Sequence, residues 1–288
     1  MRRPLSPALL LLLSLMPLLI ALFFFMKAPA RKAEPAPIPT AAQRLPPPEI
    51  TPPSENQVAP PPAAKEVRGG RAALIIDDLG YSLDAVRTLC ALKRPITVSI
   101  LPFAPATSES VRLAREGGLE IMLHLPLEAL HQKSERASEG TIYTGMTAAE
   151  IRKTVLASLA EVPGCRGVNN HTGSMITEDV RIMPVILAVL KEKKLFFIDS
   201  RTTPNTIAFD TAQSMGVPTA ARRVFLDDAS DETSIKARIE DLFRLARDNG
   251  QAIGIGHARK ETLLALEKHL GLADAYNVKL VFVSALVE

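Results

Sequence analysis

The 288-residue sequence has no tryptophan, two cysteines and few aromatic residues, which make up 5% of the chain. Two cysteines are too few for the disulfide framework of a small secreted protein. Cys90 shares an apolar helical face with Leu83 and Val86, so we expect it to pack as a small hydrophobic residue rather than pair with Cys165. With 47% hydrophobic and 23% charged residues, the composition is typical of a globular protein and excludes a chain disordered throughout.

The sequence also lacks a basic surplus outside its first 68 residues. Residues 69–288 carry 26 lysines and arginines against 27 aspartates and glutamates, and the formal charge of +3 comes from residues 1–68. A domain that neutralises a phosphate backbone needs a basic surplus or stripe. We therefore expect no nucleic-acid partner.

One long apolar run is present near the N-terminus. Ala8–Met26 spans 19 residues, enough for a helix to cross a hydrocarbon core of about 30 Å, and Arg2 and Arg3 precede it. Residues 1–27 are therefore predicted to be a signal anchor or a signal peptide. Ala28-Pro29-Ala30 is a poor cleavage site because of its proline, which favours the anchor. The positive-inside rule then predicts a periplasmic domain anchored to the inner membrane, or released into the periplasm if the signal is cleaved.

Proline is concentrated directly after this run. Of the 23 prolines, 12 lie between residues 28 and 68. Such a stretch favours polyproline II and cannot form a packed core, so residues 28–70 are predicted to be a disordered, semi-rigid linker. The linker is either a passive spacer or a docking strip for an envelope protein that reads proline-rich peptides.

Residues 71–288 alternate between short apolar runs and helical patterns. Alternation of this kind predicts an α/β domain with parallel strands, either a closed or nearly closed barrel or, as the alternative, a doubly wound sheet. The expected strands are 72–76, 96–101, 119–123, 167–169, 195–198, 224–226, 252–255 and 279–283, and the expected helices are 83–92, 107–114, 147–159, 178–192, 230–247 and 259–270.

Polar side chains follow five of these strands, where barrel enzymes carry their catalytic groups. A single histidine there is often structural, and an aspartate often only caps the next helix. Two adjacent aspartates and three histidines at one rim, without cysteine, instead match the ligands of a hydrolytic divalent metal ion, with zinc as the expected one. The polar residues that follow the five strands are, in full, Asp77, Asp78, His124, Asn169, Asn170, His171, Asp199, Ser200, Arg201 and His257.

These segments, in this order, resemble the motifs of the divergent polysaccharide deacetylases, relatives of the NodB-type carbohydrate esterases. The resemblance extends from Arg71 to Val287 and implies an incomplete (β/α)₇-type barrel. The segments that carry it are Leu74-Ile75-Ile76-Asp77-Asp78-Leu79-Gly80, His124-Leu125-Pro126-Leu127-Glu128, Asn169-Asn170-His171-Thr172-Gly173-Ser174, Asp199-Ser200-Arg201 and Gly256-His257.

The resemblance also implies roles for individual residues. It makes Asp77 the general base, Asp78 a metal ligand and His257 the general acid. The better-known branch takes two ligands from His-Thr/Ser-x-x-His, but Met175 follows His171-Thr172-Gly173-Ser174. The ligands are therefore expected to come from two strands, as His124 and His171.

The expected activity is metal-dependent hydrolysis of N-acetyl groups on amino sugars of envelope polysaccharide. Four residues are predicted to contact the glycan: Asn170, Ser174, Asp199 and Arg201. Arg201 is expected to bind an anionic substrate group or to orient Asp77. The alternative is a catalytically weak or inactive barrel that acts as a tethered periplasmic module binding glycan or protein.

Overall fold

The computed structural model describes residues 69–130 and 138–288. The predicted signal segment and nearly all of the predicted linker lie outside the described residues. Within these two ranges, no helix combines the length and the apolar character needed to cross a membrane.

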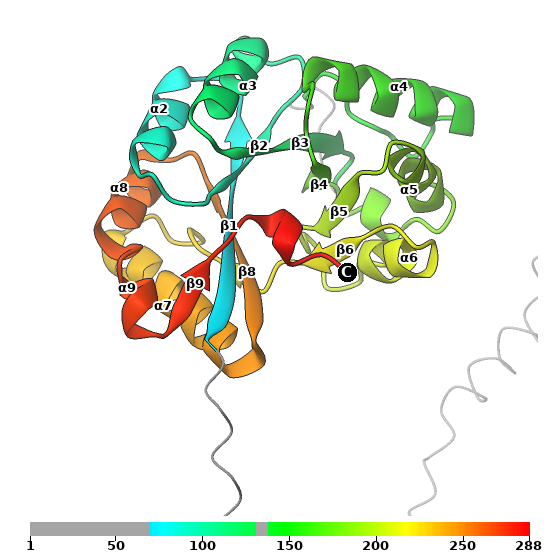
Figure 1. Ribbon diagram of the computed structural model, residues 1–288. Helices are drawn as coiled ribbons and strands as arrows, with labels where there is room; N and C mark the ends of the chain where they lie inside the picture. Colours follow the sequence, from blue (N-terminus) through cyan, green and yellow to red (C-terminus); the bar gives the residue numbers. More distant parts are fainter. Residues whose placement is uncertain (1–68, 131–137) are drawn as a thin grey trace, which may run out of the picture. The chain divides into compact units, whose positions relative to one another are not determined.

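The described residues form one curled sheet in which every strand pairing is parallel (Figure 1). Its order is β6-β5-β4-β3-β2-β1-β8-β7, and β9 pairs with the beginning of β1. The α/β class and the parallel strands predicted from the sequence are confirmed. The strands are β1 (Gly70–Leu79), β2 (Thr97–Ile100), β3 (Glu120–Leu127), β4 (Gly167–Thr172), β5 (Phe196–Asp199), β6 (Thr219–Ala221), β7 (Val224–Phe225), β8 (Gln251–His257) and β9 (Val278–Leu280).

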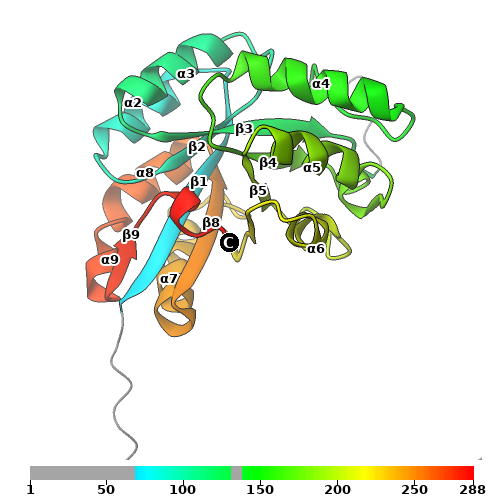
Figure 2. The ribbon, with the colours of Figure 1, turned by 45° about the vertical axis from the view of Figure 1, so that its right-hand side comes forward.

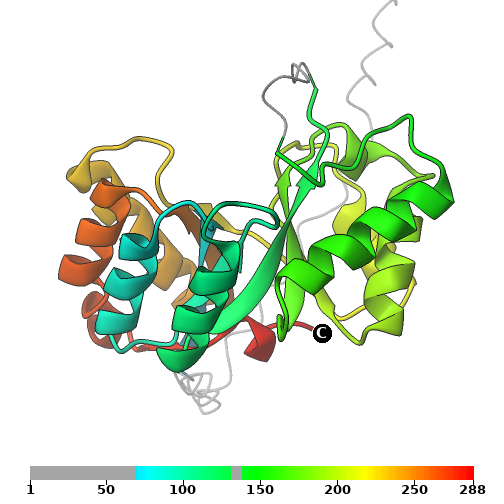
Figure 3. The ribbon, with the colours of Figure 1, turned by 90° about the horizontal axis from the view of Figure 1, so that it is seen from above.

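Helices cover the outer face of the curled sheet, as the view from above shows (Figure 3). Neighbouring helices pack on each other along this face, for example α4 on α5 and α7 on α8 (Figure 2). Thr147 begins α4 with a reciprocal capping box with Glu150, the start predicted from the sequence. The helices are α2 (Leu83–Ala91), α3 (Thr107–Glu116), α4 (Ala148–Glu161), α5 (Met183–Glu192), α6 (Ala208–Ser214), α7 (Glu232–Asn249), α8 (Lys260–His269) and α9 (Leu272–Ala275).

A continuous stretch of chain joins the two ends of the sheet. β6 pairs with β5, and the backbone N–H of Arg222 then donates to the carbonyl of Asp199. One residue later the N–H of Arg223 donates to the carbonyl of Ile253, and β7 pairs with β8. Residues 219–225 thus switch partners from one end of the sheet to the other. This curled arrangement fits the incomplete (β/α)₇ barrel expected from the sequence.

Side chains alternate between the two faces of each strand, as strand geometry requires. Outward residues pack against the helices, whereas Ala73 and Ile75 of β1 and Met122 of β3 belong to a separate inner core. Continuing the period of two along β1 and β3 places Asp77 and His124 on the same inner face. The remaining buried members of the inner core are Phe196, Ile198, Ile253, Ile255, Val283 and Leu286.

The C-terminal segment closes the inner core on the side where the strands begin. Val283 and Leu286 are buried there, and the N–H of Val283 donates to the hydroxyl of Thr97 at 3.1 Å. Glu288 exchanges backbone hydrogen bonds with Thr219 at the start of β6. The end of the chain therefore forms the floor of the barrel, opposite the carboxyl ends of the strands.

Several elements differ from the sequence prediction. The expected strand at 279–283 ends at Leu280 and gives way to a 3₁₀ helix, Val283–Ala285. The expected helix at 178–192 begins only at Met183, with Pro184 in its first turn, because proline suits a helix start and not its interior. The elements β6, α6 and α9 were not predicted, since three to seven residues are too few for a periodic pattern.

Candidate metal centre

Two consecutive aspartates lie near the end of β1, and an irregularity in the strand lets both approach the same point. In a regular strand they would face opposite sides of the sheet. Asp78 instead adopts a positive φ of 63°, and the register between β1 and β2 shifts between Ile76 and Leu79. Aspartate tolerates this left-handed conformation better than most residues. As a result, oxygens of Asp77 and Asp78 lie 3.7 and 3.2 Å from the same atom, Nε2 of His124.

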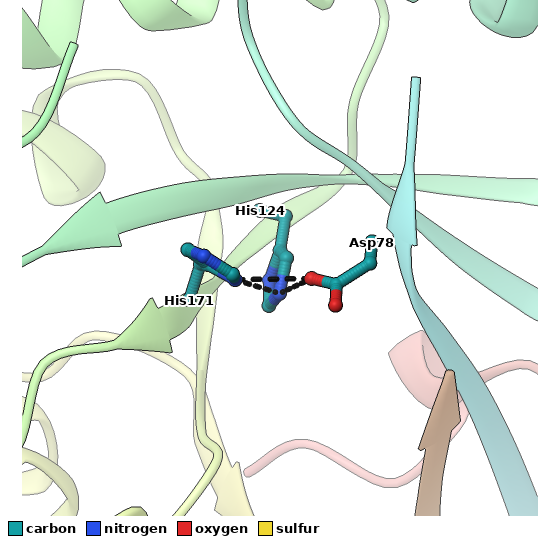
Figure 4. A group of neighbouring side chains, drawn as sticks. All are labelled: Asp78, His124 and His171. Atoms are coloured by element: carbon teal, nitrogen blue, oxygen red, sulfur yellow. Dashed lines mark hydrogen bonds and ion pairs between the residues drawn. The ribbon is translucent and has the colours of Figure 1, made fainter. Parts of the chain in front are cut away.

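Asp78, His124 and His171 point toward one another from β1, β3 and β4 (Figure 4). Oδ1 of Asp78 lies 3.2 Å from Nε2 of His124 and 3.0 Å from Nδ1 of His171. The two histidine nitrogens are themselves 3.2 Å apart. The three ligand atoms form a nearly equilateral triangle, and they are the three residues predicted from the sequence as metal ligands.

This triangle fits a divalent metal ion. Ligand bonds of about 2.0–2.2 Å at angles between octahedral and tetrahedral place neighbouring ligand atoms about 3–3.5 Å apart. Oδ1 of Asp78 is a buried atom that accepts no hydrogen bond of good geometry from the described residues. Two imidazoles and a carboxylate are also a donor set that zinc and related ions accept. The group can therefore hold a metal with three protein ligands and positions left for water or substrate.

The pKa values of the triangle follow from its charges. Burial would raise the pKa of Asp78, but the imidazoles of His124 and His171 hold it well below the usual range. Burial would lower the pKa of His124, but Asp77 and Asp78 raise it more, so the net shift is upward. The site attracts positive charge, as a cation-binding centre must.

Asp77 lies beside the triangle and is almost fully buried, with 3% of its surface exposed. Burial raises the pKa of its carboxyl, and the imidazole of His124 and the amide of Asn169 offset only part of that rise. Nδ2 of Asn169 donates to Oδ1 of Asp77 at 2.9 Å. Oδ2 is the oxygen nearer to His124, so Asp77 is a proton acceptor beside the candidate metal position.

His257 reaches the same point from β8. Its Nε2 lies 4.0 Å from Oδ2 of Asp78, and its Nδ1 lies 2.9 Å from Oδ1 of the fully buried Asp227. The other oxygen of Asp227 accepts from the backbone N–H of His257 at 2.7 Å and from the hydroxyl of Thr262 at 2.7 Å. Burial alone would lower the pKa of His257, but Asp227 raises it more.

The prediction from the sequence assigned no role to two residues of this centre. Asp227 follows the weak strand at Val224–Phe225, so the rule of polar residues after strands applied to it as well. Asn169 was noted at its strand end but given no role. Because side chains alternate, His171 on the inner face already implies that Asn169, and not Asn170, faces inward.

Two of the predicted substrate residues hold protein loops. Asn170 is 1% exposed, donates to the carbonyl of Thr172 and accepts from the N–H of Ser200. Ser174 accepts from the N–H of Leu130 at 2.9 Å. These bonds attach both side chains to neighbouring backbone, and glycan contact by either residue stays a prediction.

The other two predicted substrate residues lie after β5. Asp199 is fully buried and accepts from the N–H of Arg201, the hydroxyl of Thr206 and the N–H of Phe209. It therefore fixes the turn from β5 into α6. Arg201 adopts a positive φ of 49° and has an exposed side chain, so its guanidinium is accessible to a ligand from solution. Substrate contact by Arg201 stays a prediction.

Comparison with known proteins supports the reading of these motifs. The family described as divergent polysaccharide deacetylase matches residues 74–287, which is most of the chain and nearly all of the described domain. The chain belongs to this family. The matched residues include all the motif segments named in the sequence analysis and all three residues of the ligand triangle.

Relatives of this domain occur in bacteria. A protein of Haemophilus influenzae is 34% identical over 200 residues, covering 69% of this chain and 71% of that protein. YibQ of Escherichia coli K12 is 34% identical over 202 residues, covering 70% of this chain and 63% of YibQ. A crystal structure from Agrobacterium tumefaciens C58 has a TM-score of 0.73 at 27% identity, covering 79% of this chain and 92% of that one.

Proposed function

We propose that the domain is a metal-dependent deacetylase that hydrolyses N-acetyl groups on amino sugars of envelope polysaccharide. The observation that carries the proposal is the placement of a base and an acid beside one metal triangle. Asp77 lies next to His124, and the His257–Asp227 pair lies on the other side of Asp78. A non-catalytic binding module needs neither group.

The residues divide the work of amide hydrolysis between them. A divalent ion, with zinc the proposed one, would be held by Asp78, His124 and His171 and would supply Lewis-acid polarisation of the acetyl carbonyl and the attacking water. Asp77 accepts the proton of that water as the new C–O bond forms. His257 then donates its Nε2 proton to the departing amine when the C–N bond breaks, and Asp227 stabilises the imidazolium before this step.

The exposures of these side chains indicate where substrate enters. The side chains of Asp77 and His124 are 4% and 2% exposed, whereas those of Asp78, His171 and His257 are 36%, 23% and 18% exposed. Substrate therefore approaches over Asp78, between the two accessible histidines. The base and one ligand lie behind, away from bulk water.

The Asp77→Asn variant tests the proposal. It conserves size and leaves the ligand triangle intact, so the protein should fold and bind Zn²⁺ like the wild type. Release of acetate from N-acetylated envelope glycan should fall at least about 10²-fold, because general bases contribute about 10²–10⁴ in rate. Unchanged acetate release by the variant would refute the assignment of the base. Tight glycan binding by a wild-type protein that releases no acetate would instead support the binding module.

We also propose that the domain works in the periplasm, tethered to the inner membrane through residues 1–27. The support is the long apolar run, its preceding arginines and the proline in the poor cleavage site. The mass of the mature protein purified from membranes tests this proposal. A chain beginning near Arg31 would show that the signal is cleaved.

A further inference from the structure

Asn169 lies on the inner face of β4, between a metal-ligating histidine and the proposed base. It is fully buried. Its Oδ1 lies 2.9 Å from Nδ1 of His124 and also accepts a hydrogen bond from the hydroxyl of Ser99. Its Nδ2 donates to Oδ1 of Asp77 at 2.9 Å and to the hydroxyl of Ser200 at 3.2 Å. One amide therefore links two groups that have separate tasks.

The partners of Asn169 determine which way its amide points. An ionised carboxylate can only accept hydrogen bonds, so the NH₂ group must face Asp77. The amide oxygen then faces His124, and an oxygen can only accept. Nδ1 of a neutral His124 must therefore carry the ring hydrogen, which leaves the lone pair on Nε2. That nitrogen is the atom that faces Asp78 and His171.

We propose that Asn169 is a positioning residue that fixes the metal-binding tautomer of His124 and, through the same amide, holds Asp77 in place as the base. The first part concerns metal binding alone, and the second rests on the proposed deacetylase function. Turning the amide over would set the NH₂ group against Nδ1–H of His124 and oxygen against oxygen at Asp77. Both contacts are repulsive, so the two tasks are coupled.

The neighbouring residue provides a matched control. Asn170 is the same residue type, lies in the same strand and is equally buried, but it faces the other way and bonds to the backbone of Thr172 and Ser200. Replacing Asn170 removes buried amide hydrogen bonds without touching His124 or Asp77. A general loss of packing in β4 should appear in both variants, whereas a tautomer effect should appear only at Asn169.

The first experiment measures binding of Zn²⁺ to the purified full-length protein by competition with a chromophoric chelator. Outer partners of metal-ligating histidines typically contribute 10–100-fold in affinity, so Asn169→Leu should weaken Zn²⁺ binding by about 10–100-fold. Asn169→Asp keeps an acceptor for Nδ1–H, and its second oxygen can share one proton with Asp77, so Zn²⁺ affinity should stay within about threefold of the wild type. Asn170→Leu should also stay within about threefold. Thermal unfolding checks that each variant is folded.

The tautomer itself is the second readout. Nitrogen-15 NMR of the metal-free protein, at a pH above the raised pKa of His124, should show the ring hydrogen of His124 on Nδ1 in the wild type and in Asn169→Asp, because Zn²⁺ bound to Nε2 would itself impose this tautomer. In Asn169→Leu this preference should be lost. Wild-type affinity in Asn169→Leu, or an equal loss in Asn169→Leu and Asn169→Asp, would overturn the proposal, because neither follows from an acceptor for Nδ1–H.

The coupling to Asp77 is tested by a double-mutant cycle on acetate release. If Asn169 also acts through Asp77, the fall in kcat caused by Asn169→Leu should shrink in the Asp77→Asn background. If Asn169→Leu lowers kcat by the same factor in the wild type and in the Asp77→Asn background, the coupling between Asn169 and Asp77 is overturned. If no variant and no wild-type protein releases acetate, the deacetylase proposal fails, while affinity and tautomer still decide the role of Asn169.

Discussion

Replacing Asp227 by asparagine should disable the proposed acid while leaving the metal triangle intact. Oδ2 of Asp227 faces the backbone N–H of His257, which can only donate, so the asparagine oxygen must take that position. Its NH₂ group then replaces Oδ1 opposite Nδ1 of His257. An NH₂ group there requires an unprotonated Nδ1, so the variant disfavours the imidazolium that His257 needs as an acid.

The magnitude follows from the contacts that change. Loss of the general acid should lower kcat for acetate release by about 10²–10⁴-fold, with a much smaller change in KM. One buried hydrogen bond changes from charge-assisted to neutral, which costs about 1–2 kcal/mol in the free energy of unfolding. For a domain of about 220 residues, each kcal/mol lowers Tm by about 2–4 °C. Steady-state kinetics and thermal unfolding measure the two effects separately.

Thr262→Val is the matched control for this variant. It removes the other side-chain donor to Asp227 but leaves the bond to Nδ1 of His257 in place. We expect a similar loss of stability and a fall in kcat of less than about tenfold. An Asp227→Asn protein that keeps wild-type kcat, or a Thr262→Val protein that loses as much as Asp227→Asn, would refute the reasoning.

Three further predictions concern metal, pH and packing. Zn²⁺ at 100 times its Kd should raise the unfolding free energy of the wild type by about 2.7 kcal/mol, and alanine at Asp78, His124 or His171 should abolish this rise. His269→Ala, at a surface contact with Glu232, should keep it. Wild-type stabilisation by Zn²⁺ in the three ligand variants would contradict the site. Because Asp227 raises the pKa of His257, the wild type should exceed Asp227→Asn in unfolding free energy most strongly below about pH 6.5. This difference should shrink as the pH rises through the raised pKa of His257. Denaturant unfolding at several pH values measures it. A Cβ on Gly167 would lie 2.2 Å from the ring of Phe196, so Gly167→Ala should cost about 1–3 kcal/mol by urea unfolding, and a neutral effect would show that the ring moves freely.

Much of the centre was accessible from the sequence because parallel strands bring their carboxyl ends to one rim. Asp78, His124 and His171 are far apart in the chain, yet the rule that polar residues follow buried strands selected all three. The same rule selected His257. Period-two alternation, applied strictly, would also have placed Asn169 on the inner face beside His171.

Other features depend on contacts that a single sequence does not display. The positive φ of Asp78 comes from the register shift between β1 and β2. Asp227 follows a strand of two residues that exists because β8 provides its partner. Residues 219–225, which join the two ends of the sheet, take their conformation from the strands with which they pair, first β5 and then β8. In each case tertiary pairing, and not local propensity, decides the conformation.

Because all strands of the sheet run in the same direction, the ligand triangle and the ends of the described domain lie on opposite sides of the sheet. Gly70 donates its N–H to the carbonyl of Asn277, and Glu288 bonds to Thr219 at the start of β6. Both residues therefore lie on the side of the sheet where the strands begin. The ligand triangle lies where the strands end. Fixing the described domain to a sensor surface through residues next to Gly70 or Glu288 therefore leaves the ligand triangle facing away from that surface. A polymeric ligand added from solution can then reach the triangle without passing the point of attachment.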